Sequence, residues 1–221
     1  MLERIGKPEF SSLSTPSADA LLVLSKIKEK KDRVTIAEVG VGIGATTVEF
    51  CRNLGDSDKI YLFDFTATLN ELCGDLSALG YENVFPFGST RHTYDSYVWQ
   101  LLKLAKHHLN AGDPAIFDFI YLDGAHTFLH DSGAAAICKL LLKPGGYLLF
   151  DDYNWTFMSS PTLNPEKKPE VTGWYSSEQL SYPNVRMVCE VLMDSDKNYS
   201  RDTLGGKLNP SRVLYRKSDA L

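Results

Sequence analysis

The chain has 221 residues, of which 43% are hydrophobic and 23% are charged, and its formal net charge is −5. This length and composition are ordinary for a chain that buries a sizeable core in one α/β domain or two small ones. Because the net charge is negative, the protein as a whole is not attracted electrostatically to nucleic acid or to anionic lipid. Neither a nucleic-acid partner nor a membrane surface is therefore expected.

The cysteines and the apolar runs indicate the compartment. The four cysteines are scattered without a Cys-x-x-Cys pair, and three of them lie in apolar patterns, so we expect reduced thiols rather than disulfides or zinc ligands (Cys51, Cys73, Cys138 and Cys189). No run approaches membrane-spanning length, and no apolar segment follows the first basic residues. A cytoplasmic location is therefore expected.

The predicted elements begin with a loose arm over residues 1–15 and a helix that ends near residue 30. Thr15 or Ser17 is placed to cap this helix, and Pro16 lies early in it. Apolar β-branched runs then alternate with segments of helical spacing. We expect strands at 34–39, 59–65, 82–87, 117–122 and 147–152, separated by helices at 45–54, 68–80, 94–109 and 128–142. Pro86 confines the third strand to an edge or an end of the sheet.

This alternation predicts a doubly wound, mostly parallel sheet in a single domain over residues 1–221. The pattern breaks at 153–182, a stretch rich in proline, serine and aromatic residues that is longer than a plain connection needs. Segments 184–193 and 211–217 are then predicted as two strands, joined by the polar loop 194–210. They would form an antiparallel pair at one edge of the sheet.

A glycine-rich turn follows the first predicted strand. Glu38 ends that strand, and Gly40, Gly42 and Gly44 follow at alternate positions. In an open α/β sheet ligands bind beyond the carboxyl ends of the strands, where glycines let the backbone approach them. Asp64 ends the second strand and is placed to accept hydrogen bonds from ribose hydroxyls. The alternative is a tight turn that needs glycine for its conformation alone.

The spacing of this turn favours an adenosyl ligand over a dinucleotide. The chain has Gly-x-Gly-x-Gly, not Gly-x-Gly-x-x-Gly, and Glu38 would repel a pyrophosphate. A carboxylate suits a cationic ligand instead, and S-adenosylmethionine carries a sulfonium and an ammonium but no phosphate. No Tyr-x-x-x-Lys pair for hydride chemistry is present in the sequence.

On these motifs the chain resembles the class I S-adenosylmethionine-dependent methyltransferases over nearly its whole length. Their E/D-x-G-x-G-x-G turn matches residues 38–44, their ribose-binding acid matches Asp64, and their Leu-Lys-Pro-Gly-Gly turn matches Leu142 to Gly146. The resemblance implies a Rossmann-like, seven-stranded sheet that is mostly parallel, with a C-terminal antiparallel strand pair. It also implies that Phe65, Ser89, Thr90 and Asp123 contribute to the adenosyl site.

Within that superfamily, "YLDGAH" and "LLKPGGYLLFDDYNW" are similar to the small, metal-dependent O-methyltransferases of the macrocin type. The resemblance implies a divalent metal with ligands Asp123, Asp151 and Asp152, and we expect this metal to be Mg²⁺. It also implies a catalytic role for Asp123 and His126. The acceptor would be a hydroxyl group of a small molecule such as a sugar, a phenol or another natural product.

The residues themselves favour the same chemistry. Neighbouring parallel strands bring Asp123 and the Asp151–Asp152 pair to one rim, where close carboxylates raise one another's pKa unless a cation compensates. An imidazole titrates near neutral pH, so His126 is a candidate general base. The alternatives are that the Asp151–Asp152 pair caps a turn and that His126 caps the following helix. His130 is expected on the helix surface.

The segment 153–182 carries clustered aromatic residues and is expected to form a substrate lid; the alternative is a loop that packs on the sheet. An S-adenosylmethionine-dependent O-methyltransferase is the predicted function. The alternatives are an N-methyltransferase, and a cyclase or non-catalytic protein that retains the adenosyl site. A homo-oligomer is compatible with the sequence.

Overall fold

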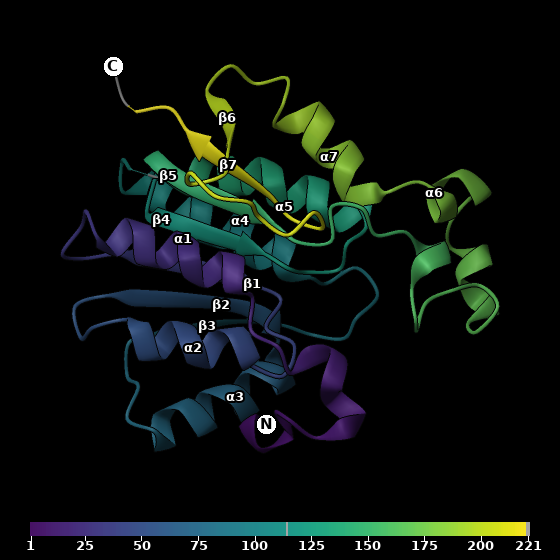
Figure 1. The fold of residues 1–221 in the computed structure, drawn as a ribbon, viewed down its shortest axis with the longest axis horizontal. Coiled ribbons are helices and arrows are strands. Elements are labelled where there is room, and N and C mark those ends of the chain that lie inside the picture. Colours follow the sequence, from purple (N-terminus) through teal and green to yellow (C-terminus); the bar gives the residue numbers. More distant parts are fainter. Residues whose placement is uncertain (114, 220–221) are drawn as a thin grey trace.

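The computed structural model describes residues 1–113 and 115–219 as a seven-stranded sheet with helices on both faces (Figure 1). The strands are β1 (Thr35–Val39), β2 (Lys59–Phe65), β3 (Val84–Ser89), β4 (Phe117–Leu122), β5 (Leu142–Phe150), β6 (Tyr199–Asp202) and β7 (Val213–Lys217). Their order is β3-β2-β1-β4-β5-β7-β6. The pairs among β1 to β5 are parallel, whereas β7 is antiparallel to both β5 and β6. The predicted fold class is confirmed.

The helices lie in two layers with a separate core on each face of the sheet. The seven α-helices of the described part are α1 (Ala18–Lys28), α2 (Ala45–Asn53), α3 (Thr66–Ala78), α4 (Tyr97–Asn110), α5 (Phe128–Leu141), α6 (Ser177–Ser181) and α7 (Asn184–Leu192). Side chains of α1, α2 and α3 pack in one core, and those of α4, α5 and α7 pack in the other. All six residues of β4 are buried, as befits a central strand covered on both faces.

Several local predictions are confirmed. Ser17 caps α1 by accepting a hydrogen bond from the backbone N–H of Ala20. Gly80 follows the end of α3 with φ +89°, the left-handed conformation in which glycine commonly ends helices. Pro86 lies in β3, which is an edge strand. All four cysteines lie among the described residues and are free, and three of them are buried.

The prediction for the C-terminal strands was wrong in its residues. The segment 184–193 forms the helix α7, and β6 lies within the stretch predicted as a loop. Val185, Val188 and Cys189 are buried, and this spacing of three and four residues is helical. The β-branched valines suggested a strand, but the helical period is satisfied by packing against α5 in the second core. The antiparallel pair at the sheet edge does form, from β6 and β7.

The arm and the segment 153–182 also have defined structure. The arm contains the 3₁₀ helices η1 (Leu2–Arg4) and η2 (Pro8–Leu13), and it lies beside the end of the sheet where β1 and β2 finish (Figure 1). The segment 153–182 contains η3 (Phe157–Ser159), η4 (Pro169–Gly173) and α6, and it projects from the body of the domain with a small core of its own. Among the described residues, no helix is long and apolar enough to cross a membrane.

Candidate functional site

The carboxyl ends of β1, β4 and β5 are held side by side by backbone hydrogen bonds just past each strand. The N–H of Asp123 donates to the carbonyl of Val39 at 2.8 Å, and the N–H of Asp151 donates to the carbonyl of Leu122 at 3.0 Å. Each bond extends the parallel ladder by one residue beyond the strand. The acids predicted after β4 and β5 are therefore brought to one rim, as expected for neighbouring parallel strands.

The glycine turn after β1 has two different tasks. Gly40 has φ +87°, and a Cβ atom there would lie 2.0 Å from the carbonyl oxygen of Asp123, so only glycine lets the turn pass the end of β4. Gly44 precedes α2, and a Cβ atom there would lie 2.5 Å from Leu72. A Cβ atom at Gly42 would meet open space. Gly40 and Gly44 thus serve close packing, and Gly42 faces the space where a ligand would lie.

Two adjoining cavities open at this rim. The β2-side cavity, of about 550 Å³, is lined by the ends of β1, β2 and β3 and by the loops after β3 and β4. The β5-side cavity, of about 300 Å³, is lined by the start of α2, the end of β5 and the residues before β7. Leu13, Gly42, Asp123 and His126 line both cavities. Asp123 and His126 therefore lie where the two spaces meet.

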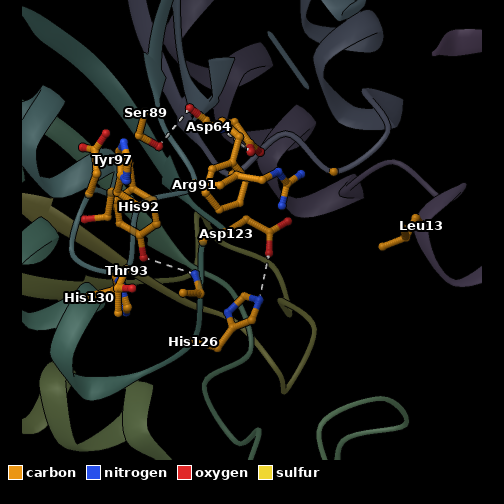
Figure 2. Close-up of a pocket in the computed structure, with 17 residues that line it drawn as sticks. Leu13, Asp64, Ser89, Arg91, His92, Thr93, Tyr97, Asp123, His126 and His130 are labelled. Atoms are coloured by element: carbon orange, nitrogen blue, oxygen red, sulfur yellow. Dashed lines mark hydrogen bonds and ion pairs between the residues drawn. The ribbon is translucent and has the colours of Figure 1, made fainter. Parts of the chain in front are cut away.

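Asp64 is oriented by the glycine turn. Its carboxylate accepts hydrogen bonds from the backbone N–H of Val41 at 2.9 Å and from that of Phe65 at 2.6 Å. It lines the β2-side cavity together with Phe65 and Ser89 (Figure 2). Thr90 does not line either cavity; its N–H and hydroxyl both donate to Asp95 at 2.7 Å. Among the other predicted adenosyl residues, Glu38 lines the β5-side cavity and Gly44 lines neither. The β2-side cavity therefore gathers the remaining ones: Gly40, Gly42, Asp64, Phe65, Ser89 and Asp123.

Glu38 lies beneath the β5-side cavity. Its residue is 1% exposed, and one carboxylate oxygen accepts a hydrogen bond from the hydroxyl of Thr47 at 2.7 Å. The pKa of Glu38 is raised to about 8, mainly by burial; the hydrogen bond from Thr47 opposes this rise, and the charges of Asp123 and Asp64 contribute to it. A cationic ligand in the cavity would favour the ionised form of this carboxyl group.

His126 lies between two carboxylates. Its Nε2 atom is 3.7 Å from an oxygen of Asp123 and 3.4 Å from an oxygen of Asp152. Both His126 and Asp152 have left-handed backbone conformations, with φ +55° and +52°. Such conformations are rare outside glycine and asparagine and concentrate at functional sites. Thr127, and not His126, caps α5, so the imidazole is left at the rim (Figure 2).

The third acid of the rim has other partners. One oxygen of Asp151 accepts the hydroxyl hydrogen of Tyr121 and a hydrogen bond from Nε of Arg212 at 3.1 Å, and the other accepts the N–H of Asp152 at 2.8 Å. The Tyr121 hydroxyl also lies 3.0 Å from Asp123. Partial burial and the charge of Asp151 raise the pKa of Asp123 to about 7. Burial likewise raises the pKa of Asp152.

These contacts decide how well the rim suits a metal ion. Oxygen ligands on Asp123 and Asp152 fit a hard divalent cation in their chemistry, and both acids retain oxygens that face the imidazole. Asp151 fits less well, because its oxygens already accept hydrogen bonds from Tyr121, Arg212 and the backbone of Asp152, and the guanidinium of Arg212 places a positive charge beside it. Within residues 1–113 and 115–219, no group of three or more His, Cys, Asp or Glu side chains is arranged to hold a metal.

Sequence reasoning missed several residues of the site. His130, expected on the helix surface, lines the β2-side cavity, and its Nδ1 lies 2.8 Å from the hydroxyl of Thr127. Leu13 of the arm lines both cavities. The helical period of α5 could have placed His130 on the same face as Thr127. No sequence pattern marked Arg212 or Leu13 as a site residue, because both reach the rim only through the tertiary structure.

The segment 153–182 packs against the rim mainly through Trp155. No described residue of this segment lines either cavity. Trp155 packs against His126 with ring centroids 5.9 Å apart, and Phe157 and Tyr175 continue the aromatic contact outward. Phe157 and Val171 are buried in the small core of the segment. The segment therefore packs beside the imidazole in this structure.

Solved structures share this fold at low sequence identity. The O-methyltransferase TomG from Streptomyces achromogenes, solved with S-adenosylmethionine, is 18% identical, with 90% of this chain and 79% of that chain covered and a TM-score of 0.57. A protein assigned as a caffeoyl-CoA O-methyltransferase from Staphylococcus aureus is 15% identical, with 98% and 92% covered and a TM-score of 0.60. At these identities the likeness shows the fold.

A family comparison covers the part of the chain that builds the rim. No curated protein matches the sequence. The family model described as "Methyltransferase domain" matches residues 37–153, from within β1 to just beyond β5. This range contains the glycine turn, Asp64, the turn of Asp123 and His126, and the Asp151–Asp152 pair, and it exceeds half of the 221 residues. The chain therefore belongs to the methyltransferase domain family and is a methyltransferase.

Proposed function

We propose that the protein transfers a methyl group from S-adenosylmethionine to a hydroxyl group of a small molecule. The observation that carries the proposal is the position of His126 and Asp123 at the junction of two cavities. The β2-side cavity has Asp64, Phe65 and Ser89, which suit an adenosyl group, and the glycine turn borders both cavities. The other is polar and lies beside the acids. A donor and an acceptor in these spaces would meet at the imidazole.

The adenosyl part of the donor would lie in the β2-side cavity, and its methionine end would extend past the glycine turn toward Glu38, at the β5-side cavity, where it would meet the acceptor. Asp64 would accept hydrogen bonds from the ribose hydroxyls, and Phe65 and Ser89 would border the adenine. The carboxylates of Glu38 and Asp123 would favour the sulfonium and the ammonium groups of the donor. The solved complex of TomG with S-adenosylmethionine supports this choice of ligand on the same fold.

His126 would act on the acceptor. The thioether that leaves the donor is neutral, so methyl transfer needs no acid at that end. The hydroxyl group is the weaker partner and needs to lose its proton as its oxygen attacks the methyl carbon. Nε2 of His126 would take that proton, and the nearby carboxylates of Asp123 and Asp152 would stabilise the imidazolium. The products are the methyl ether and S-adenosylhomocysteine.

The proposal includes one divalent metal ion, such as Mg²⁺, with two protein ligands. Asp123 and Asp152 would hold it, and it would supply a Lewis acid that lowers the pKa of the acceptor hydroxyl. The raised pKa values of these two acids support a need for positive charge at the rim. Excess EDTA should then abolish turnover and leave the affinity for S-adenosylhomocysteine within about twofold; full activity in EDTA would remove the metal from the proposal.

Calorimetry with S-adenosylmethionine and S-adenosylhomocysteine is the first test, followed by a screen of sugars and phenols for methylation. We expect binding of both adenosyl ligands and methyl transfer to at least one hydroxylated acceptor. His126→Ala should bind S-adenosylhomocysteine normally and turn over about 10²–10⁴-fold more slowly, whereas His107→Ala, on the exposed end of α4, should have normal activity. Absence of adenosyl binding at millimolar concentration would refute the proposal. Binding without turnover of any acceptor would favour a non-catalytic role.

A further inference from the structure

Arg212 is brought to the rim by the register of the sheet. In the antiparallel pair of β5 and β7, Phe150 lies opposite Val213. The residues just outside this pair are Asp151 and Arg212. The backbone contact continues beyond them, because the N–H of Tyr153 donates to the carbonyl of Ser211 at 2.7 Å. The position of Arg212 beside Asp151 is therefore fixed by main-chain pairing as well as by side-chain attraction.

The guanidinium group is held between two acids. Nε donates to Asp151 at 3.1 Å, and Nη1 donates to Asp19, in the first turn of α1, at 3.2 Å. The Asp19 oxygen also accepts the N–H of Asn209 at 3.0 Å, which ties the loop before β7 to α1. The side chain of Arg212 is 18% exposed, and those of Asp151 and Asp19 are 9% and 13% exposed. This is a largely buried ion pair with contacts at both ends.

The pairing places a permanent positive charge at the third acid of the rim. A divalent cation bound to Asp151 would lie within a few ångströms of the guanidinium, and their repulsion would weaken binding, since like charges interact strongly away from bulk water. Asp151 would also have to exchange its hydrogen bonds with Tyr121 and Arg212 for the metal. Asp123 also accepts the Tyr121 hydroxyl, at 3.0 Å, and His126 lies beside both Asp123 and Asp152. Among the described residues, however, neither of these two acids forms an ion pair with an arginine or a lysine, and the charge of Arg212 acts on Asp152 only at longer range.

We propose that Arg212 is a built-in counter-ion that takes the place of a divalent cation at Asp151, so that the rim offers a metal only Asp123 and Asp152. The proposal rests on the proposed function for the role of the rim, but it concerns metal affinity and is tested without an acceptor. It predicts weak metal binding in the natural chain. It also predicts that removal of the arginine creates a complete three-acid site.

The test is a titration with Mn²⁺, in which free Mn²⁺ is followed by electron paramagnetic resonance. Arg212→Gln should bind Mn²⁺ at least about tenfold more tightly than the unchanged protein, because the repelling charge is gone and Asp151 is released. Asp151→Asn added to Arg212→Gln should remove this gain. Arg212→Lys keeps the charge and should show no gain. Arg201→Gln is the matched control: it removes the same charge from a pair with Asp194 elsewhere and should leave the affinity unchanged.

A second measurement uses variants that retain Arg212, so that it does not depend on whether the protein folds without this buried side chain. In the protein that retains Arg212, Asp151→Asn should change the Mn²⁺ affinity less than about threefold, whereas Asp123→Asn or Asp152→Asn should lower it about tenfold or more. The proposal is overturned if Arg212→Gln folds but binds Mn²⁺ no more tightly than the unchanged protein does. The same holds if neither protein binds Mn²⁺. It is also overturned if Arg212→Lys gains as much as Arg212→Gln, or if Asp151→Asn alone abolishes binding. Binding of S-adenosylhomocysteine, measured separately, reports on the proposed function.

Discussion

At the scale of the residue, Asp64 has two tasks. It accepts two backbone hydrogen bonds, from Val41 and Phe65, which fix the glycine turn against the end of β2. The same carboxylate lines the cavity in which the ribose of the donor would lie. The carboxylate is thus already oriented by the backbone before a ligand binds. Its removal would affect both the turn and the ligand contact.

Asp64→Ala should weaken the binding of S-adenosylhomocysteine by roughly 1–3 kcal/mol, the range for hydrogen bonds to a charged group. Calorimetry measures this loss directly. Asp56→Ala is a suitable control, because Asp56 is exposed in the loop between α2 and β2. Equal affinities for Asp64→Ala and the unchanged protein would show that the ribose is not bound at the end of β2.

At the scale of the element, the glycine turn separates a packing requirement from a ligand requirement. Gly40→Ala places a Cβ atom against the backbone of Asp123, which cannot move without disturbing β4. We expect a loss of at least about 2–3 kcal/mol in the free energy of unfolding. Gly42→Ala should cost only about 1 kcal/mol, the penalty for a left-handed residue in open space. Urea unfolding compares the two variants.

Ligand binding tests the second requirement. Gly42 lines both cavities, so Gly42→Ala should lower the affinity for S-adenosylhomocysteine although it leaves the fold nearly intact. If Gly40→Ala is as stable as Gly42→Ala, the close approach of the turn to β4 does not constrain the fold.

The segment 153–182 is the element whose role stays a prediction. It was expected to be a lid, and in the structure it packs beside the imidazole through Trp155. A lid would have to move over the cavities when the acceptor binds. Its backbone amides should then gain protection from hydrogen exchange in the presence of S-adenosylhomocysteine and an acceptor. Full protection in the free protein, unchanged by ligands, would indicate a fixed wall.

At the scale of the whole molecule, buried acids link stability to pH. The pKa values of Glu38, Asp123 and Asp131 are raised to about 8, 7 and 6, with burial as the main cause in each. The folded protein therefore binds more protons than the unfolded chain between the ordinary carboxyl values and these raised ones. Stability contributed by these groups is present below the unfolded pKa values and is lost as the pH rises through the folded ones.

We expect the free energy of unfolding of the ligand-free protein to fall between about pH 5 and pH 8. Glu38→Gln keeps a neutral side chain beside Thr47 and should remove part of this fall, on the order of 2–4 kcal/mol at pH 8. Urea unfolding at both pH values provides the measurement, with Glu82→Gln as a control at an exposed loop position. A stability that rises over this range in the unchanged protein would contradict the raised pKa values.

The sequence by itself determined the parts of the protein that depend on local chemistry. The alternation of apolar strands and amphipathic helices predicted the sheet and the approximate positions of β1 to β5. It could do so because the hydrophobic period of a strand or a helix depends only on residues close together in the sequence. The spacing of Glu38, Gly40, Gly42 and Gly44 predicted the turn in the same way, and the strand ends predicted that Asp123 would meet the acids after β5. The secondary-structure errors include α7, which was predicted as a strand because β-branched residues competed with a helical period, and β6, which lies in a predicted loop.

Only the tertiary structure decided which partners each side chain has at the rim. Arg212 lies 61 residues from Asp151 in the sequence and reaches it through the register of β5 and β7. Leu13 reaches the cavities because the arm folds back along the end of the sheet, and Trp155 reaches His126 because the segment 153–182 packs there. Contacts between residues far apart in the chain depend on packing and register, and these are properties of the assembled sheet that no local pattern encodes.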